Sequence, residues 1–228
     1  MARRSVGRTT TAPVAEALPS VPVRGRLTGA RSSRAKSAIT QERLRRATAR
    51  LLEQKPLREL KVADITTLAA VAPATFYVYF ADVNEAVLAV IEDAYQEQPD
   101  FAAMIDRFAE RTLVADVRAY VKVYLEFWDE HYAVLRVRNL TADEGDPRFR
   151  AARARALGPA LRALSAKITA FRGASLGDVR PMALATVVAG TMERLAPIVH
   201  VRPPGRDLSR RRLVDAAVLL ISEALSPR

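Results

Sequence analysis

No cysteine occurs among the 228 residues of the chain, which excludes disulfide bonds, thiolate zinc sites and a cysteine nucleophile. Histidine is nearly as scarce, because the only two, His131 and His200, stand far apart in the sequence. The chain also lacks a glycine-rich phosphate loop and any spacing typical of metal ligands. We therefore expect a protein that is not an enzyme and that uses no metal and no cofactor.

Long apolar runs are missing too. No segment approaches the roughly 18 apolar residues that a membrane span needs. Arginines near the N-terminus are not followed by the apolar stretch of a signal peptide. The sequence therefore predicts a cytoplasmic protein without a membrane partner.

Glycine is absent from residue 30 to residue 144, and the prolines within that span fall where predicted helices begin or end. Apolar residues recur at the helical spacing i, i+3, i+4, and no segment shows the alternation of a strand. Because half of the residues are apolar, the chain can bury a sizeable core. These patterns predict an all-α fold.

Acidic residues are rare near the N-terminus. Residues 1–37 hold eight arginines and lysines against Glu16 alone, hence a net charge of +7 out of +11 for the whole chain. Few large apolar residues occur there, so we expect a disordered arm. A basic arm is attracted to polyphosphate, although a solubilising tail explains the same composition equally well.

Two short helices with a tight turn between them are predicted over residues 62–70 and 73–79. Pro73 suits the first position of a helix, where its missing N–H costs nothing. Phe76 and Phe80 lie on one side of the second helix and are expected in the core. The other faces carry small residues at the start and hydroxyl groups further on, as in a helix that enters a DNA major groove.

The stretch from Arg43 to Glu85 resembles the DNA-binding domain of the tetracycline-repressor (TetR) family. That family carries a pattern of the form D-I-A-x-x-A-G-V-S-x-x-T-[FL]-Y-x-[YH]-F. The chain matches it at Asp64, Ile65, Ala69, Val71, Thr75, Phe76, Tyr77, Tyr79 and Phe80. It departs at Thr66, and it has Ala70, Ala72 and Val83 where the family usually has glycine, serine and lysine.

The resemblance implies that this stretch binds a double-stranded DNA operator. Thr75 and Tyr79 would contact phosphates, and such contacts position a helix without reading sequence. Between residues 62 and 98 there is no lysine or arginine, so the electrostatic attraction is left to the arm and to a first helix that we expect to begin at Thr40. The candidate DNA-binding residues are Thr40, Arg43, Ala72, Pro73, Ala74, Thr75, Tyr77, Val78 and Tyr79.

Aromatic residues gather after Pro99, on helices predicted over residues 101–111 and 115–130. Ligand pockets are mostly apolar with a few polar groups, although a plain helical core explains any one of these residues equally well. Asn139 and Glu193 are the polar candidates on neighbouring apolar helices. The candidate ligand-binding residues are Phe101, Met104, Phe108, Tyr120, Tyr124, Phe127, Trp128, Asn139, Met192 and Glu193.

The last predicted helix, over residues 209–225, is apolar on nearly all sides, so we expect it in a core or an interface. The resemblance implies a homodimeric regulator, usually a repressor, that is relieved by a small, mostly apolar effector. The predicted division is a disordered basic arm (1–37), a helix-turn-helix domain (38–82) and a helical ligand-binding and dimerisation domain (83–228). The alternative is a helical small-molecule sensor without specific operator recognition, because the predicted groove helix lacks Arg, Asn and Gln.

Overall fold

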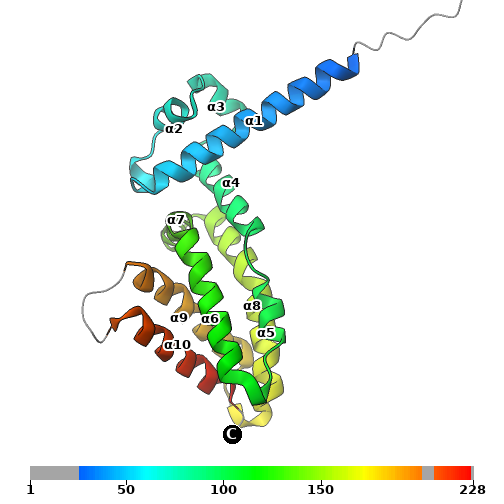
Figure 1. Cartoon of the computed structure of the whole chain (residues 1–228), viewed down its shortest axis with the longest axis vertical. Coiled ribbons are helices and arrows are strands. Elements are labelled where there is room, and N and C mark those ends of the chain that lie inside the picture. The colour runs from blue at the N-terminus through cyan, green and yellow to red at the C-terminus, as the bar shows by residue number, and fades with distance from the viewer. Residues whose placement is uncertain (1–25, 202–207, 227–228) are drawn as a thin grey trace, which may run out of the picture. The chain divides into compact units, whose positions relative to one another are not determined.

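The computed structural model describes residues 26–201 and 208–226, and within these ranges every regular element is helical. The predicted all-α fold is therefore confirmed (Figure 1). The α-helices are α1 (Arg26–Leu52), α2 (Val62–Ala69), α3 (Pro73–Tyr79), α4 (Val83–Gln96), α5 (Phe101–Asp106), α6 (Leu113–Glu130), α7 (Tyr132–Asp143), α8 (Pro147–Arg172), α9 (Pro181–Val201) and α10 (Arg210–Leu225).

The chain divides into two compact units, Met1–Ile39 and Thr40–Arg228, and the boundary falls inside α1. The predicted start of the first helix at Thr40 is wrong, and so is the predicted disorder of residues 26–37, because α1 already begins at Arg26. The physical reason is the composition of residues 26–40, which lacks proline and contains three alanines, three arginines and one lysine, all good helix formers. Residues 1–25 of the predicted arm lie outside the described residues.

One hydrophobic core joins the helix-turn-helix segment to the helices that follow it. It is built on large buried side chains from α1, α2 and α3, among them Leu44, Ile65 and Phe76. Side chains of α4 pack in the same core, and so do Val134 of α7 and Phe149 of α8. The segment that resembles a DNA-binding domain is therefore packed directly against the first turns of α8.

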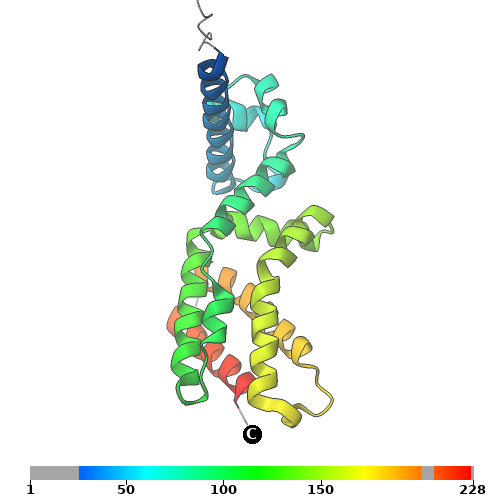
Figure 2. The same cartoon turned by 90° about the vertical axis from the view of Figure 1, so that its right-hand side faces the viewer.

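A second hydrophobic core is formed by α5, α6, α8, α9 and α10 (Figure 2). Its largest fully buried side chains include Trp128, Leu125 and Met192. The helix expected over residues 101–111 ends at Asp106, since Lys167 of α8 donates hydrogen bonds to the carbonyls of Asp106 and Phe108, at 2.9 and 3.1 Å. These bonds satisfy carbonyl groups at the helix end.

The C-terminal helices α9 and α10 carry apolar side chains both in the core and on the surface. An 18-residue window of α9 has a mean hydropathy of 1.4, so one helix among the described residues does have the length and composition of a membrane span. Buried core residues such as Ala185, Val188 and Met192 contribute to this value. Helix α10 has apolar side chains on both its buried and its exposed side, because Val218 is 2% exposed in the core whereas Leu219 is 64% exposed.

Candidate nucleic-acid interface and effector cavity

Helices α2 and α3 meet at an angle of 101° across a turn of three residues, Ala70 to Ala72. This is the geometry of a helix-turn-helix. Ala70 ends α2 in the left-handed conformation, with φ 52°, and its N–H is donated to the carbonyls of Thr66 and Thr67. Pro73 occupies the first turn of α3, as its fixed φ and missing N–H predict.

The predicted groove residues lie on the outer face of α3. Phe76 and Phe80 are buried, as predicted, with ring centroids 5.5 Å apart. The opposite face exposes 61% of Tyr77 and 75% of Val78. Ala72, Pro73 and Ala74 are exposed as well, whereas Thr75 and Tyr79 are half-buried at the edges of the face. Because Phe76 and Phe80 face the core, the opposite side of α3 is the one that a DNA duplex can reach.

Asp64 holds the start of α2 in place. Its Oδ2 accepts hydrogen bonds from the Lys55 ammonium at 2.6 Å and from the Lys61 backbone N–H at 2.9 Å. The Lys55 contact first, and then the Lys61 N–H, lower the pKa of the Asp64 carboxyl below its ordinary value. The matched acidic residue of the family pattern therefore has a structural role here as the capping group of the first motif helix.

Arg43 contacts the helix-turn-helix turn from α1. Its guanidinium donates a hydrogen bond to the carbonyl of Ala70 at 3.3 Å. Thr40, the other candidate on this helix, is half-buried. The structure therefore places Arg43 beside the turn that precedes α3.

The strained turn residue gives a first prediction. Ala70→Gly is expected to raise the free energy of unfolding by about 0.5–1 kcal/mol, because glycine adopts a positive φ without the steric cost that alanine bears. Urea denaturation at a fixed protein concentration measures the change. The control is Ala69→Gly, one residue earlier in regular helix, where glycine should cost about 1 kcal/mol. A loss of stability in Ala70→Gly would contradict the prediction.

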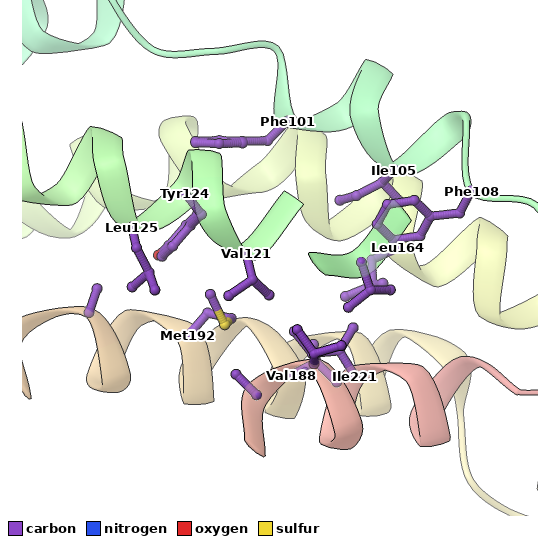
Figure 3. Close-up of a cluster of buried hydrophobic side chains, with 14 of the residues drawn as sticks. Phe101, Ile105, Phe108, Val121, Tyr124, Leu125, Leu164, Val188, Met192 and Ile221 are labelled. Atoms are coloured by element: carbon purple, nitrogen blue, oxygen red, sulfur yellow. The ribbon is translucent and has the colours of Figure 1, made fainter. Parts of the chain in front are cut away.

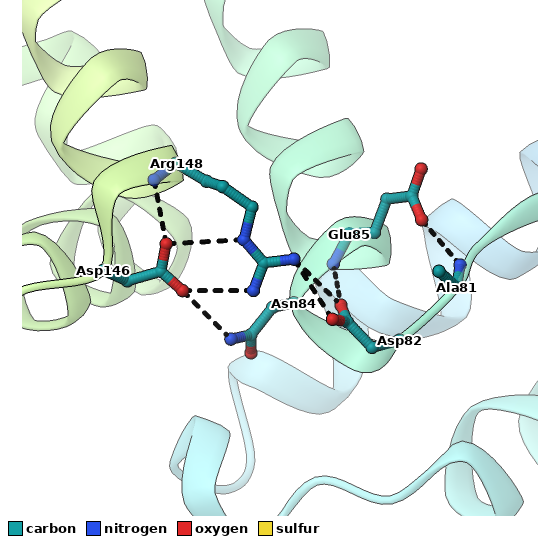
Figure 4. A network of polar contacts seen from close by, with 6 residues as sticks. All are labelled: Ala81, Asp82, Asn84, Glu85, Asp146 and Arg148. Atoms are coloured by element: carbon teal, nitrogen blue, oxygen red, sulfur yellow. Dashed lines mark hydrogen bonds and ion pairs between the residues drawn. The ribbon is translucent and has the colours of Figure 1, made fainter.

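A polar network ties the start of α4 to the start of α8 (Figure 4). Asp82 caps α4 by accepting the Glu85 backbone N–H at 2.7 Å, and it also accepts a bond from Arg148 of α8 at 3.1 Å. Asp146, the N-cap of α8, accepts bonds from the backbone and side chain of Arg148 and from the amide of Asn84. Hydrogen bonds to Asp146 and then to Asp82 raise the pKa of Arg148, which stays a cation.

A small, mostly apolar cavity, called here the inner cavity, lies among α5, α6, α7, α8, α9 and α10. Figure 3 shows several of the side chains that line it. Its free volume is only about 30 Å³, whereas pockets for drug-sized ligands measure about 300–1,000 Å³. A ligand can therefore enter only if the lining side chains or helices move apart. The lining residues are Gln98, Phe101, Ile105, Phe108, Tyr120, Tyr124, Phe127, Trp128, Arg138, Ala156, Leu157, Ala160, Leu161, Leu164, Val188, Ala189, Met192, Glu193 and Ile221.

Most of the predicted ligand residues come together around the inner cavity. The structure brings to its wall Phe101, Phe108, Tyr120, Tyr124, Phe127, Trp128, Met192 and Glu193. Met104 does not line the inner cavity and packs half-buried against the same core. Asn139 lies outside the cavity and accepts a hydrogen bond from Arg138 at 2.9 Å. Burial raises the pKa values of the Tyr120 and Tyr124 hydroxyls, which stay neutral.

The inner cavity contains a buried ion pair that the sequence analysis missed. Arg138 of α7 is 2% exposed and donates a hydrogen bond to Glu193 of α9. It also contacts the Tyr95 hydroxyl at 3.4 Å, and its guanidinium lies 5.9 Å from the centre of the Trp128 ring. Burial is the largest single effect and acts to lower the pKa of Arg138, but the Glu193 carboxylate together with Tyr95 and Tyr124 keeps the pKa above its ordinary value.

A signal for Arg138 is present in the sequence. Val134 and Arg138 are four residues apart, and Thr141 follows three residues later, so all three share the apolar face of α7. A cation on the buried stripe of a helix needs a buried partner. Glu193, which was singled out on α9, is that partner.

Glu97, Glu130 and His131 form a separate polar cluster, where α4 ends beside the junction of α6 and α7. One potential ligand atom from each lies within 4.8 Å of the others. His131 Nε2 is 3.5 Å from the Glu97 carboxylate, and both glutamates are exposed. Among the described residues, this is the one group of three histidine or acidic side chains close enough together to hold a metal ion. That the protein uses no metal stays a prediction from the sequence.

Two family models match the chain. The model described as bacterial regulatory proteins of the tetR family matches residues 44–89. The model described as the tetracyclin repressor-like C-terminal domain matches residues 106–205. No curated protein matches the sequence significantly.

Solved structures show the same fold. Regulatory protein TetR from Rhodobacter sphaeroides is 22% identical, with a TM-score of 0.54 over 82% of this chain and 98% of that chain. A transcriptional regulator from Saccharomonospora viridis in complex with choline is 18% identical, with a TM-score of 0.59 over 82% and 98%. The regulator FadR from Bacillus subtilis in complex with stearoyl-CoA is 14% identical, with a TM-score of 0.57 over 81% and 97%.

A helix-turn-helix followed by an all-α domain with an apolar cavity is the arrangement of a ligand-responsive DNA-binding regulator. The chain belongs to the TetR family of transcriptional regulators. Members of this family are regulators of transcription and not enzymes.

Proposed function

We propose that the protein is a repressor that binds a near-palindromic operator as a homodimer in the cytoplasm. Residues 38–82 bind DNA in this proposal, and residues 83–228 bind the effector and the second subunit. The observation that carries it is the outer face of α3, where exposed Tyr77 and Val78 lie opposite the buried Phe76. That face begins with small residues and carries hydroxyl groups at its edges, and both features suit a helix that enters a major groove.

The proposed DNA contacts are of two kinds, contacts to phosphates that position the helix and contacts to base edges that read the sequence. Thr75 and Tyr79 bind phosphates from the edges of α3, with Thr40 and Arg43 beside them on α1. Ala72, Pro73, Ala74, Tyr77 and Val78 face the base edges. Methyl groups such as those of Ala74 and Val78 recognise thymine by apolar contact, so specificity in this proposal depends on thymine methyls and on the shape of the duplex.

Loss of either phosphate-facing hydroxyl is expected to weaken operator binding without unfolding the protein. Thr75→Ala and Tyr79→Phe should each cost about 1.5–3 kcal/mol, the value of a hydrogen bond to a charged group. A gel shift at stated salt against the DNA upstream of the chain's own gene measures the affinity. Thr169→Ala, which removes an exposed hydroxyl on α8, is the matched control. Unchanged affinity in both groove variants would refute the assignment.

The dimer in this proposal uses the last two helices. Large apolar side chains are exposed there, including Val187 and Val201 of α9 and Leu219 and Leu220 of α10. Contiguous exposed apolar surface marks an interaction site. A two-fold dimer presents two groove helices to two half-sites, which is why we propose a near-palindromic operator.

Charge at the proposed interface is expected to give monomers. Leu219→Glu combined with Leu220→Glu should convert the dimer to a folded monomer in light scattering, because both side chains are about half exposed or more, at 64% and 48%. Leu140→Glu on α7, with the same 48% exposure as Leu220, is the control. Val218 is unsuitable for this test because it is buried in the subunit core. Persistence of the dimer in the double variant would exclude the interface.

The effector in this proposal is a small, mostly apolar molecule that enters the inner cavity. Aliphatic and aromatic side chains make up most of its wall, and its polar groups include the ion pair of Arg138 with Glu193. Structures similar to this chain have been determined in complex with choline and with stearoyl-CoA. Because the free volume of the cavity is only about 30 Å³, an effector must displace lining side chains or helices. A displacement of the helices is what can alter DNA affinity.

A further inference from the structure

A second hollow, called here the outer groove, adjoins the inner cavity on the side of α7, α8 and α9. Its free volume is about 390 Å³. The walls of the two hollows have side chains in common, because Trp128, Leu157, Leu161, Ala189 and Glu193 line both. The inner cavity and the outer groove are therefore adjacent, and these five residues lie between them.

The shared leucines form a movable partition. Leu157 and Leu161 stand four residues apart on one face of α8, and both are half-buried. A leucine side chain changes rotamer without any change in the backbone. An apolar chain arriving from the outer groove can therefore pass between the two hollows by displacing these side chains.

Among the described residues, the outer groove has unpaired cations but no unpaired carboxylate. Its carboxylates are already paired, Asp143 with Arg153 at 2.7 Å and Glu193 with the buried Arg138. Its two remaining cations are Arg136 of α7 and Arg194 of α9, both exposed. Neither forms an ion pair with any residue that the structure describes. A cationic ligand would meet no free carboxylate in this groove, whereas an anion would meet two free guanidinium groups.

We propose that the outer groove binds an anionic head group and that the effector is an amphipathic anion whose apolar tail enters the inner cavity. The inference rests on the proposed effector role of that cavity and adds the chemical class of the ligand. Arg136 and Arg194 are the specificity-determining residues, and Arg is suited to this role because its planar fork matches carboxylate and phosphate groups.

Three probes with the same tail test the head group: dodecanoate, dodecanol and dodecyltrimethylammonium. Each is titrated into the full-length protein below its micelle concentration. The single tryptophan of the chain, Trp128, lines both hollows and reports binding by fluorescence. We expect dodecanoate to bind at least about tenfold more tightly than either of the other probes, equivalent to about 1.4 kcal/mol. Equal affinities for the three probes, or no binding of dodecanoate, would overturn the proposal.

Variants assign the preference to the two arginines. The double change Arg136→Glu and Arg194→Glu should weaken dodecanoate at least about tenfold and leave dodecanol within about twofold. Arg162→Glu, an exposed arginine of α8 outside both hollows, is the matched control. Retention of the dodecanoate preference in the double variant would overturn the assignment.

Operator release is measured separately by gel shift with the same probes. If dodecanoate binds with the expected preference but the operator stays bound, the head-group site stands and the proposed induction fails. If dodecanol and dodecanoate bind alike and both release the operator, the proposed function stands and the anionic site fails. The two proposals therefore have different outcomes.

Discussion

Replacing Arg138 with alanine is expected to lower the free energy of unfolding by about 3–5 kcal/mol, because the change leaves a buried carboxylate without its partner. Arg138 is 2% exposed and the Glu193 side chain 11% exposed, so water cannot replace the lost contact. Arg138 also contacts Tyr95 of α4 and Trp128 of α6. One truncation thus disturbs the contacts of four helices, α4, α6, α7 and α9.

The double variant Arg138→Met with Glu193→Leu separates the charge from the packing. Replacing a buried ion pair by apolar side chains of similar size is often neutral or stabilising, so we expect it to recover most of the loss. Arg136→Ala, an exposed arginine two residues away on α7, should change stability by no more than about 0.5 kcal/mol. Urea denaturation at fixed protein concentration of the wild type, Arg138→Met, Glu193→Leu and the double variant gives the four free energies of unfolding in the cycle. Additive effects of the two single changes would show that the pair is not coupled.

The sequence predicts the groove helix closely because its constraints are local. Pro73 fixes the first turn of α3, and the four-residue spacing of Phe76 and Phe80 fixes its buried side. The start of α4 is set equally locally, since Asp82 accepts the backbone N–H of Glu85, three residues further on. Each of these features depends on residues no more than four positions apart, so no knowledge of the tertiary fold is needed.

The errors occur where a local signal competes with helix propensity or with long-range packing. Thr40 can cap a helix, but the residues before it favour helix as well, and α1 continues back to Arg26. The apolar pattern of α10 does not say which side faces the core, and the structure buries Val218 and exposes Leu219. The partner of Arg138 lies 55 residues further along the chain, beyond any periodic pattern.

The position of α8 suggests how an effector changes DNA affinity. Cavity residues Leu157 and Ala160 flank Pro159, which lies inside the helix. Proline removes a backbone hydrogen bond, so a helix bends there at least cost. The first turn of α8 carries Arg148, which binds Asp82 at the start of α4, only three residues after the end of α3 (Figure 4). Movement of α8 therefore has a direct polar contact through which to reach the groove helix.

Loss of Arg148 is expected to uncouple the effector from the operator. In the wild type an amphipathic effector such as dodecanoate should lower operator affinity by about 5–150-fold, the range of a coupling free energy of 1–3 kcal/mol. Arg148→Met should reduce this factor to about twofold or less while effector affinity without DNA stays unchanged. Stability should change little, because both side chains of the Arg148–Asp82 pair are about half exposed, at 44% and 51%.

Titrations of the effector with and without operator DNA measure the coupling, with Trp128 fluorescence as the signal. Linkage requires that operator DNA weaken the effector by the same factor by which the effector weakens the operator. Arg162→Met on the exposed face of α8 is the control and should keep the full coupling. If Arg148→Met keeps it too, the signal does not pass through the start of α8. The remaining route is then α4 itself, whose Tyr95 contacts Arg138 at the cavity wall and donates a hydrogen bond to the Ala152 carbonyl at 3.0 Å.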